Sequence, residues 1–267
     1  MTAIKRIFGF LFWCYFWLLF IPFTVVLGLI FLFISLFLPK YLVRKLHILA
    51  VFWGRVGMAL LWSYPKIYGK LRENLRHEAL VLASNHQSQI DILIALAAYP
   101  INFLFMSKKE VFNIPLVGTA MRKMGYISVD RENPTKAALS IKEAIRELKQ
   151  GYAVLIYPEG TRSPNAAEML PFKLGTLRIA SEGEFPIVPI VVYGTQQISD
   201  KGKRFYLWPH KTAILILDPI EKTHDLHPAN KKSPLSDQQK LAKLRDIMMQ
   251  AYRTLAQHNG RLPPDAS

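Results

Sequence analysis

The 267-residue chain has a single cysteine, Cys14, which lies inside an apolar run. One thiol cannot make an intrachain disulfide or a cysteine-based zinc site, and such sparing use of cysteine indicates a reducing, cytosol-facing location. The chain also lacks the Gly-x-Ser-x-Gly elbow of an α/β serine hydrolase. Its seven histidines show neither His-x-x-x-His nor His-Glu-x-x-His spacing, so no metal site is predicted.

Acidic residues are scarce: 19 stand against 34 basic ones, a formal net charge of +15. Such an excess attracts nucleic acid, an anionic membrane surface, or phosphorylated and acidic substrates. No nucleic-acid-binding module is recognisable, and we predict that no nucleic acid is bound. A hydrophobic share of 51% is above the usual share of a soluble domain, which favours contact with lipid.

Charged residues are absent from Ile7 to Pro39, a run long enough to span a bilayer. It far exceeds the roughly 7–15 apolar residues of a signal peptide, so cleavage is not expected. One straight helix would be about 48 Å long against a hydrocarbon core of about 30 Å, so it must tilt, kink at Pro22 or fold back. A second apolar stretch, Leu46–Trp62, follows. We predict that residues 1–64 form a membrane-anchoring helical hairpin that dips into one leaflet.

After residue 64, short apolar runs alternate with polar turns, and we assign residues 65–267 to an α/β domain. The predicted strands are Ala79–Ala83, Ile101–Met106, Ala153–Tyr157, Ile187–Tyr193 and Thr212–Leu217. The predicted helices are Ile90–Ala98, a helix capped by Asn133 and ended by Gly151, and Asp237–His258. This alternation indicates a mostly parallel or mixed sheet flanked by helices, with its chemistry where strands end.

The segment Asn85-His86-Gln87-Ser88-Gln89-Ile90-Asp91 follows the first predicted strand. If a helix starts near Ser88, Asp91 lies in its first turn and can reach back to His86. A carboxylate placed there would orient the imidazole and leave its other nitrogen free to act as a general base on an alcohol. The local pattern alone equally fits a plain helix cap with His86 packed beside it.

A second polar segment, Tyr157-Pro158-Glu159-Gly160-Thr161-Arg162-Ser163, closes another predicted strand. Arg162 presents a planar fork suited to phosphate, and Gly160 allows a close backbone approach. The alternative is an ordinary loop held by a contact between Glu159 and Arg162. Lys108 and Arg131 also follow apolar runs, from which they could reach the same pocket, although each taken singly is more typical of a solvated surface charge.

The segment "NHQSQID" resembles the His-x4-Asp motif of the glycerolipid acyltransferases, the bacterial 1-acylglycerol-3-phosphate acyltransferase family. "SVDR", "YPEGTRS" and "IVPIVV" resemble the family's second, third and fourth motifs, in the same order and within residues 79–195. The departures are mild: Tyr157 stands where Phe is common, and Val129 stands where Ile is common.

This resemblance implies the glycerolipid acyltransferase fold and a direct transfer without an acyl-enzyme. His86 would take the proton of the acceptor hydroxyl, and Asp91 would hold the imidazole. The residues expected to bind substrate, chiefly the acceptor's phosphate, are Lys108, Arg131, Glu159, Gly160, Thr161 and Arg162.

The implied reaction moves a fatty acyl group from acyl-CoA or acyl carrier protein to the sn-2 hydroxyl of lysophosphatidic acid. Phosphatidic acid is the product, and no cofactor is required. The alternatives are another lysophospholipid or glycerol 3-phosphate as acceptor, or a catalytically silent membrane scaffold of the same fold. We expect the bacterial inner membrane as the location, with the catalytic domain facing the cytoplasm and an acidic carrier approaching Lys201, Lys203 and Arg204.

Overall fold

The computed structural model describes residues 3–165, 167–200, 202, 205–226 and 235–262, and these form one seven-stranded sheet with the order β1-β7-β6-β2-β5-β3-β4. The strands are β1 (Lys66–Tyr68), β2 (Val81–Ser84), β3 (Phe103–Lys108), β4 (Ile127–Val129), β5 (Ala153–Ile156), β6 (Ile187–Tyr193) and β7 (Ala213–Ile216). Every neighbouring pair is parallel except β6 and β7. The predicted α/β fold with a mostly parallel sheet is confirmed.

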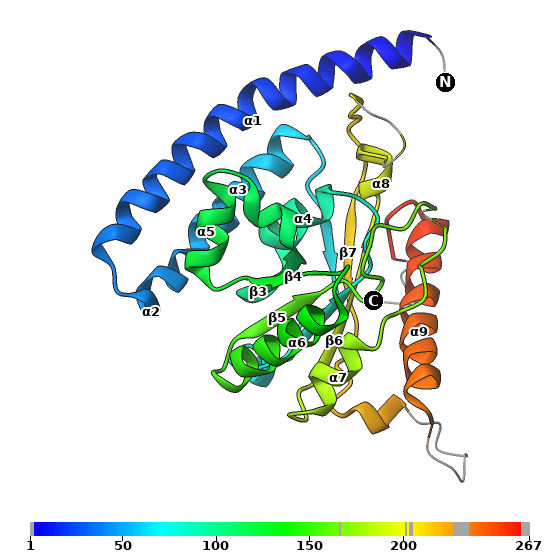
Figure 1. Ribbon diagram of the computed structural model, residues 1–267. Helices are drawn as coiled ribbons and strands as arrows, with labels where there is room; N and C mark the ends of the chain where they lie inside the picture. Colours follow the sequence, from blue (N-terminus) through cyan, green and yellow to red (C-terminus); the bar gives the residue numbers. More distant parts are fainter. Residues whose placement is uncertain (1–2, 166, 201, 203–204, 227–234, 263–267) are drawn as a thin grey trace.

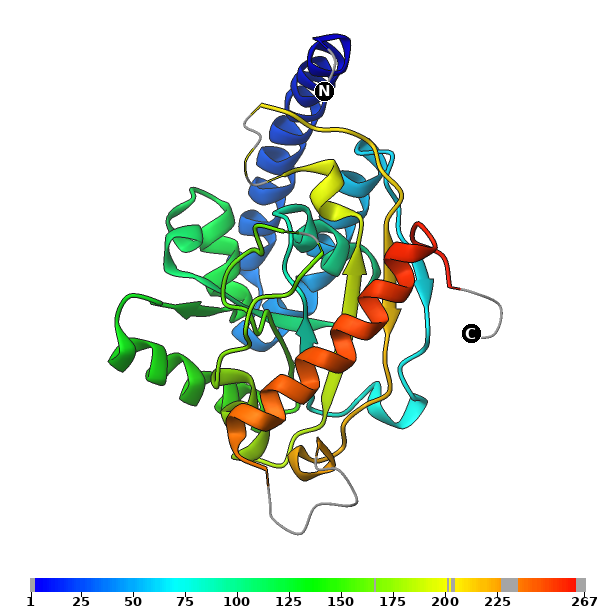
Figure 2. The same cartoon turned by 90° about the vertical axis from the view of Figure 1, so that its right-hand side faces the viewer.

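Helices cover both faces of the sheet (Figures 1 and 2). They are α1 (Ala3–Phe37), α2 (Lys40–Val43), α3 (His47–Leu60), α4 (Ile90–Ala98), α5 (Val117–Met124), α6 (Pro134–Lys149), α7 (Gly175–Ser181), α8 (Thr195–Ile198) and α9 (Asp237–Gln257). Because side chains alternate along a strand, Leu82 joins the core under α1, α3 and α4, whereas Val81 and Ala83 join the core under α6, α7 and α9.

Strand β3 begins and ends two residues later than the predicted strand Ile101–Met106. Its first half, Phe103–Phe105, pairs with β5, and its second half, Met106–Lys108, pairs with β4. Pairing with β4 therefore draws the polar end of the segment into the sheet, which the apolar pattern alone could not indicate. As a result Lys108 is the last residue of a strand, at the edge where the other polar segments lie.

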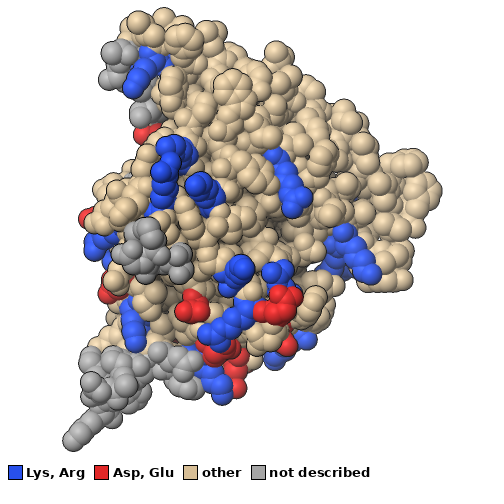
Figure 3. Space-filling view, turned by 180° about the vertical axis from the view of Figure 1, so that it is seen from behind, with Lys and Arg blue, Asp and Glu red and all other residues tan. Residues whose placement is uncertain are grey.

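The apolar N-terminal run forms one continuous helix, α1, which contains Pro22 and curves over the body (Figure 1). By length and composition α1 could cross a membrane. One side packs on the body through Phe16, Phe20 and Phe31, while the other side exposes large apolar side chains along the whole helix. From behind, the surface over α1 is almost free of charged side chains beyond the N-terminal end of the helix, and all but a little of the Asp and Glu surface lies below it (Figure 3).

After α1 the chain folds back through α2 into α3, which packs closely against α4. A Cβ atom on Gly54 would lie 2.7 Å from the Leu96 Cβ and 2.9 Å from the Leu93 oxygen, so this helix crossing requires glycine. The core is thus continuous from α1 through α3 to the sheet. The division between an anchor and a catalytic domain near residue 65 stays a prediction.

Candidate active site

Four parallel strands, β2, β5, β3 and β4, end at the same edge of the sheet, and polar segments follow each of them. The loop after β2 is fixed at its first residue, because the Asn85 amide donates to the Val192 carbonyl at 2.9 Å and accepts from the Val192 N–H at 2.7 Å. Asn85 thereby ties this loop to β6 and holds the next residue, His86, in place. The sequence places Asn85 in the motif but does not indicate this role.

His86 and Asp91 form a tight pair: His86 Nδ1 lies 2.7 Å from Asp91 Oδ2. Asp91 is fully buried in the first turn of α4, and the same oxygen accepts the backbone N–H groups of Gln87 at 2.7 Å and Ser88 at 2.8 Å. An ionised carboxylate that takes these N–H donors also accepts the Nδ1–H of His86, which leaves Nε2 as the unprotonated nitrogen. The geometry therefore suits His86 to act as a general base through Nε2.

The imidazole also rests on an aromatic ring from the neighbouring strand. The rings of His86 and Tyr157 stack with centroids 4.1 Å apart and 18° between their planes. Burial, with the nearby charges of Tyr99 and Asp91, raises the pKa of the Tyr157 phenol well above its usual value, so the phenol stays protonated. The stack and the bond to Asp91 together fix the orientation of the ring. Nothing in the sequence indicates this contact beyond a Tyr directly after β5.

Glu159 connects the loop of His86 to the loop after β5. One carboxylate oxygen accepts the His86 backbone N–H at 2.8 Å, and the other accepts the Leu170 N–H at 2.8 Å. Burial raises the pKa of the Glu159 carboxyl to about 7, although both N–H donors favour the charged form. Next to it, Gly160 has a φ of +68°, a left-handed conformation that favours glycine. Glu159 therefore holds the two loops together through its hydrogen bonds and does not pair with Arg162.

We predict that Glu159 makes the stability of the protein depend on pH. Its pKa is higher in the folded state than the usual 4.5, so the folded state retains this proton while the unfolded state loses it. The contribution to stability is full below pH 4.5 and is lost as the pH rises through about 7, an effect of about 3 kcal/mol. Thermal unfolding of the wild type and Glu159→Gln at several pH values measures it.

The Glu159→Gln variant should lack this pH-dependent part. At pH 8 two changes oppose each other: the amide has only one oxygen for two N–H donors, a loss of about 1–3 kcal/mol, but it buries no charge, which offsets that loss. Glu168→Gln, an exposed change in the same loop, is the matched control and should behave as wild type. An unchanged pH slope in Glu159→Gln would contradict the assignment.

Among the basic residues predicted to bind phosphate, Arg162 is next in the chain to a residue that contacts His86. The N–H of the next residue, Ser163, donates to the His86 carbonyl at 2.7 Å. The partly exposed guanidinium of Arg162 makes no hydrogen bond or ion pair with any residue that the structure describes. A cation beside the dyad that lacks a protein partner remains available for a phosphate. Thr161 is exposed in the same loop.

Lys108 and Arg131 lie on the same edge of the sheet but farther away. With about 4.8 Å between strands, β3 and β4 stand about 10 and 14 Å from β2. The Lys108 ammonium pairs with Glu110 at 3.2 Å, and Arg131 is exposed. The structure thus brings Glu159, Gly160 and Arg162 next to the dyad and leaves Lys108 and Arg131 at the rim. Lys201, Lys203 and Arg204 lie outside the described residues.

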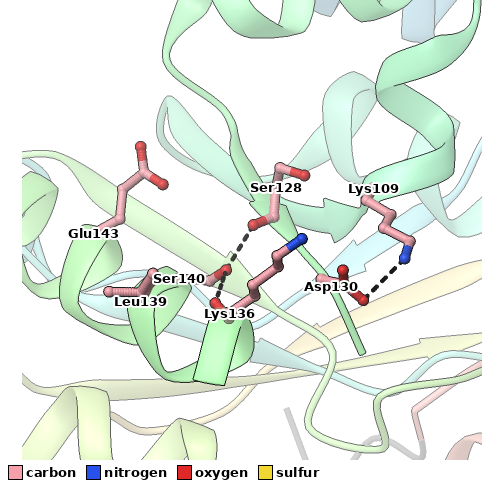
Figure 4. A pocket seen from close by; sticks show the side chains of 7 residues that line it. All are labelled: Lys109, Ser128, Asp130, Lys136, Leu139, Ser140 and Glu143. Atoms are coloured by element: carbon pink, nitrogen blue, oxygen red, sulfur yellow. Dashed lines mark hydrogen bonds and ion pairs between the residues drawn. The ribbon is translucent and has the colours of Figure 1, made fainter. Parts of the chain in front are cut away.

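A pocket beside β4 contains basic side chains, but acidic side chains balance their charge (Figure 4). Its two ammonium groups, Lys109 and Lys136, are matched by Asp130 and Glu143. Lys109 pairs with Asp130 at 3.1 Å, and Ser140 donates to the Ser128 carbonyl at 2.6 Å. With its charges balanced, this pocket offers no net attraction for an anion.

The fold and the buried His–Asp pair are those of an acyltransferase: residues 66–193 match a protein-family model described as Acyltransferase. The chain belongs to the 1-acyl-sn-glycerol-3-phosphate acyltransferase family. It is 33% identical to such an enzyme of Limnanthes alba over 65% of this chain and 69% of that protein. It is 30% identical to that of Bacillus subtilis over 71% of this chain and 87% of that protein.

Other relatives are longer: the match to the Limnanthes douglasii enzyme, at 35% identity, spans only 58% of that protein. Among solved structures, the crystal structure of PlsC from Thermotoga maritima, described as an LPA acyltransferase, superposes with a TM-score of 0.77 at 24% identity. The superposition covers 94% of this chain and 98% of that chain, so α1–α3 and the sheet both belong to the shared fold.

Proposed function

We propose that the protein transfers a fatty acyl group from acyl-CoA or acyl carrier protein to the sn-2 hydroxyl of lysophosphatidic acid, giving phosphatidic acid in phospholipid synthesis. The observation that carries this proposal is the 2.7 Å contact between His86 and the buried Asp91, which leaves Nε2 of the imidazole as the base. The relatives named as 1-acyl-sn-glycerol-3-phosphate acyltransferases support the choice of acceptor.

In the proposed mechanism Nε2 of His86 removes the proton of the acceptor hydroxyl as its oxygen attacks the thioester carbonyl. Asp91 stabilises the imidazolium that forms, because its Oδ2 accepts the Nδ1–H. The tetrahedral intermediate then expels the thiolate, and the imidazolium returns the proton to sulfur. An ester bond has formed, a thioester bond has broken, and His86 is neutral again. The acyl group never bonds to the protein.

The guanidinium of Arg162 would hold the phosphate of lysophosphatidic acid while Glu159 and Gly160 keep its loop in place. When the phosphate is held in place, the hydroxyl is oriented toward the thioester, and such orientation can supply a large part of the rate enhancement. Lys108 and Arg131, at the rim of the same edge, would add a longer-range attraction for the phosphorylated acceptor.

A panel of donors and acceptors tests this proposal. The purified full chain in detergent is given lysophosphatidic acid, lysophosphatidylcholine or glycerol 3-phosphate, each with acyl-CoA and with acyl carrier protein. We expect the largest kcat/KM for lysophosphatidic acid, and we expect Arg162→Ala to raise its KM more than the KM of the donor. Equal use of lysophosphatidylcholine, which carries a choline on its phosphate, would contradict the proposed acceptor.

We further propose that residues 1–64 anchor the catalytic domain, residues 65–267, to the cytoplasmic face of a bacterial inner membrane. The exposed apolar side of α1 supports this placement, since a helix with such a side lies well in the interfacial region of one leaflet. The match to a Bacillus subtilis relative supports a bacterial location. Lipid substrate would then reach the site from the leaflet.

Charges on the exposed side of α1 should release the protein from the membrane. Leu18 and Phe33 are 74% and 64% exposed, so Leu18→Glu with Phe33→Glu leaves the packing against the body intact. Each charge costs about 2–3 kcal/mol in the membrane interior, and the variant should appear in the soluble fraction after a carbonate wash. The control, Leu139→Glu with Ile247→Glu on the catalytic domain, should stay with membranes. Retention of both variants would contradict the anchor.

A further inference from the structure

A pocket of about 470 Å³ lies where α1 ends, between α2 and the C-terminal end of α6. Three cationic side chains and one carboxylate line it: Lys40, Arg44, Arg146 and Glu147. The chain contributes these residues from two segments about 100 positions apart, brought together by the fold. The pocket belongs neither to the edge of the sheet where His86 lies nor to the proposed mechanism.

The cations in this pocket outnumber its anions, and Glu147 holds two of them. Glu147, whose side chain is 3% exposed, accepts from Arg44 at 2.6 Å and pairs with Arg146 at 3.2 Å. Arg44 also lies over the Tyr152 ring, 4.4 Å from its centroid. Lys40 makes no ion pair with any described residue. Three cations against one carboxylate leave a net charge of +2 in a prebuilt cradle.

Two other groups affect an anion in this cradle. The C-terminal end of α6 directs its negative dipole toward the pocket, which opposes an anion, although Lys149 in the last turn offsets it. Glu143 also reaches Arg146, at 3.5 Å, but both side chains are exposed and such a pair contributes little. The balance still favours negative charge, and Lys40 is the cation of this pocket that has no carboxylate partner among the described residues.

The pocket lies at the end of the apolar surface of α1. The side chains just before and within α2, Leu36, Phe37 and Tyr41, are 72%, 73% and 66% exposed. If α1 lies along one leaflet, these side chains enter the lipid and the cationic cradle beside them stands at the depth of the headgroups. Basic groups immediately next to a membrane-associated segment attract anionic headgroups.

From this juxtaposition we propose that the pocket of Lys40, Arg44 and Arg146 binds the phosphate of an anionic phospholipid headgroup. The proposal rests on the proposed membrane association. Its occupant is a lipid of the membrane in which the enzyme works, held apart from the acceptor at the His86 site. Binding there would fix the α1–α2 turn, and with it the angle at which the catalytic domain meets the leaflet.

The test removes charge from the pocket while it keeps the Arg44–Glu147 pair. Lys40→Gln with Arg146→Gln is compared with Lys243→Gln with Arg253→Gln, which removes the same charge from α9, on the far side of the molecule from α2 (Figure 1). The full chain is mixed with vesicles of phosphatidylcholine alone or with added phosphatidylglycerol, and binding is measured by flotation. Affinity for phosphatidylglycerol vesicles should fall about 30-fold in the pocket variant and less than about threefold in the control.

If both variants lost the same affinity for phosphatidylglycerol vesicles, the attraction would come from overall charge, and the proposed site would be wrong. A wild type that binds both kinds of vesicle equally well would also contradict it. Inorganic phosphate added without vesicles should give no saturable heat of binding; saturable binding that the pocket variant loses would assign free phosphate and overturn the lipid. Acyl transfer in detergent micelles should be unchanged in both variants. Because the micelle assay needs no membrane, it tests the proposed reaction independently of the proposed lipid site.

Discussion

Replacing His86 by alanine is expected to lower kcat for lysophosphatidic acid by about 10²- to 10⁴-fold, because the variant loses the base that removes the hydroxyl proton. KM for the acceptor should change little, since Arg162 rather than His86 would bind the phosphate. The measurement is transfer of a radiolabelled acyl group into phosphatidic acid at saturating donor. Full activity in the His86→Ala variant would contradict the proposed mechanism.

The His86→Ala variant should fold, because the side chain is only one partner of a stack and of Asp91, whose two backbone bonds remain. His77→Ala, which changes an exposed histidine ahead of β2, is the matched control and should keep wild-type kcat. A Tm close to that of the wild type, measured on the same preparation, would separate lost chemistry from lost structure.

Two substitutions of Asp91 should differ from each other in a way that follows from its hydrogen bonds. All three donors, His86 Nδ1 and the N–H groups of Gln87 and Ser88, converge on Oδ2. In Asp91→Asn the two backbone donors require the amide oxygen at this position, so the Nδ1–H of His86 keeps its acceptor and only the charge is lost. A charged acceptor is stronger than a neutral one by about 1–2 kcal/mol, so kcat should fall about 5- to 30-fold.

Asp91→Ala should lose about 10³- to 10⁴-fold in kcat, because the ring then has neither a fixed tautomer nor a charge. It should also unfold more easily, by about 1–3 kcal/mol for each buried N–H left without an acceptor. Steady-state kinetics with thermal unfolding of both variants would show the order. An Asn variant as slow as the Ala variant would mean that the amide turns its NH₂ toward Nδ1, contrary to the expected geometry.

The contact between His86 and Asp91 was predictable because the two residues are close in the chain, but the local pattern equally fitted a helix cap, and the catalytic role was predicted from the resemblance to the acyltransferase family. His86 and Asp91 are five positions apart, and the first turn of a helix that starts after the loop brings them into contact. The sheet was predictable for a similar reason, since buried strands such as β6 and capped helices such as α6 carry their signals locally. Only tertiary pairing could extend β3 to Lys108.

The surroundings of the dyad could not be predicted, because they join distant segments. Glu159 reaches the His86 N–H across 73 positions, and Tyr157 reaches the imidazole only because β5 pairs with β2. The contact between Glu159 and Arg162, which was the alternative interpretation of this loop, is not formed. Similarly, nothing local shows that Lys40 and Arg146 share one pocket. The sequence shows which residue types are present, but contacts between distant segments depend on the fold.

The central claim is that His86 catalyses direct transfer between donor and acceptor, and a single-turnover experiment tests it most directly. Enzyme in excess over radiolabelled acyl-CoA is mixed with saturating lysophosphatidic acid, and the reaction is quenched at successive times. We predict that the label passes from donor to phosphatidic acid without appearing on the protein, and that it stays on the donor in His86→Ala. Label that first appears covalently on the protein and is then chased into phosphatidic acid would contradict the account.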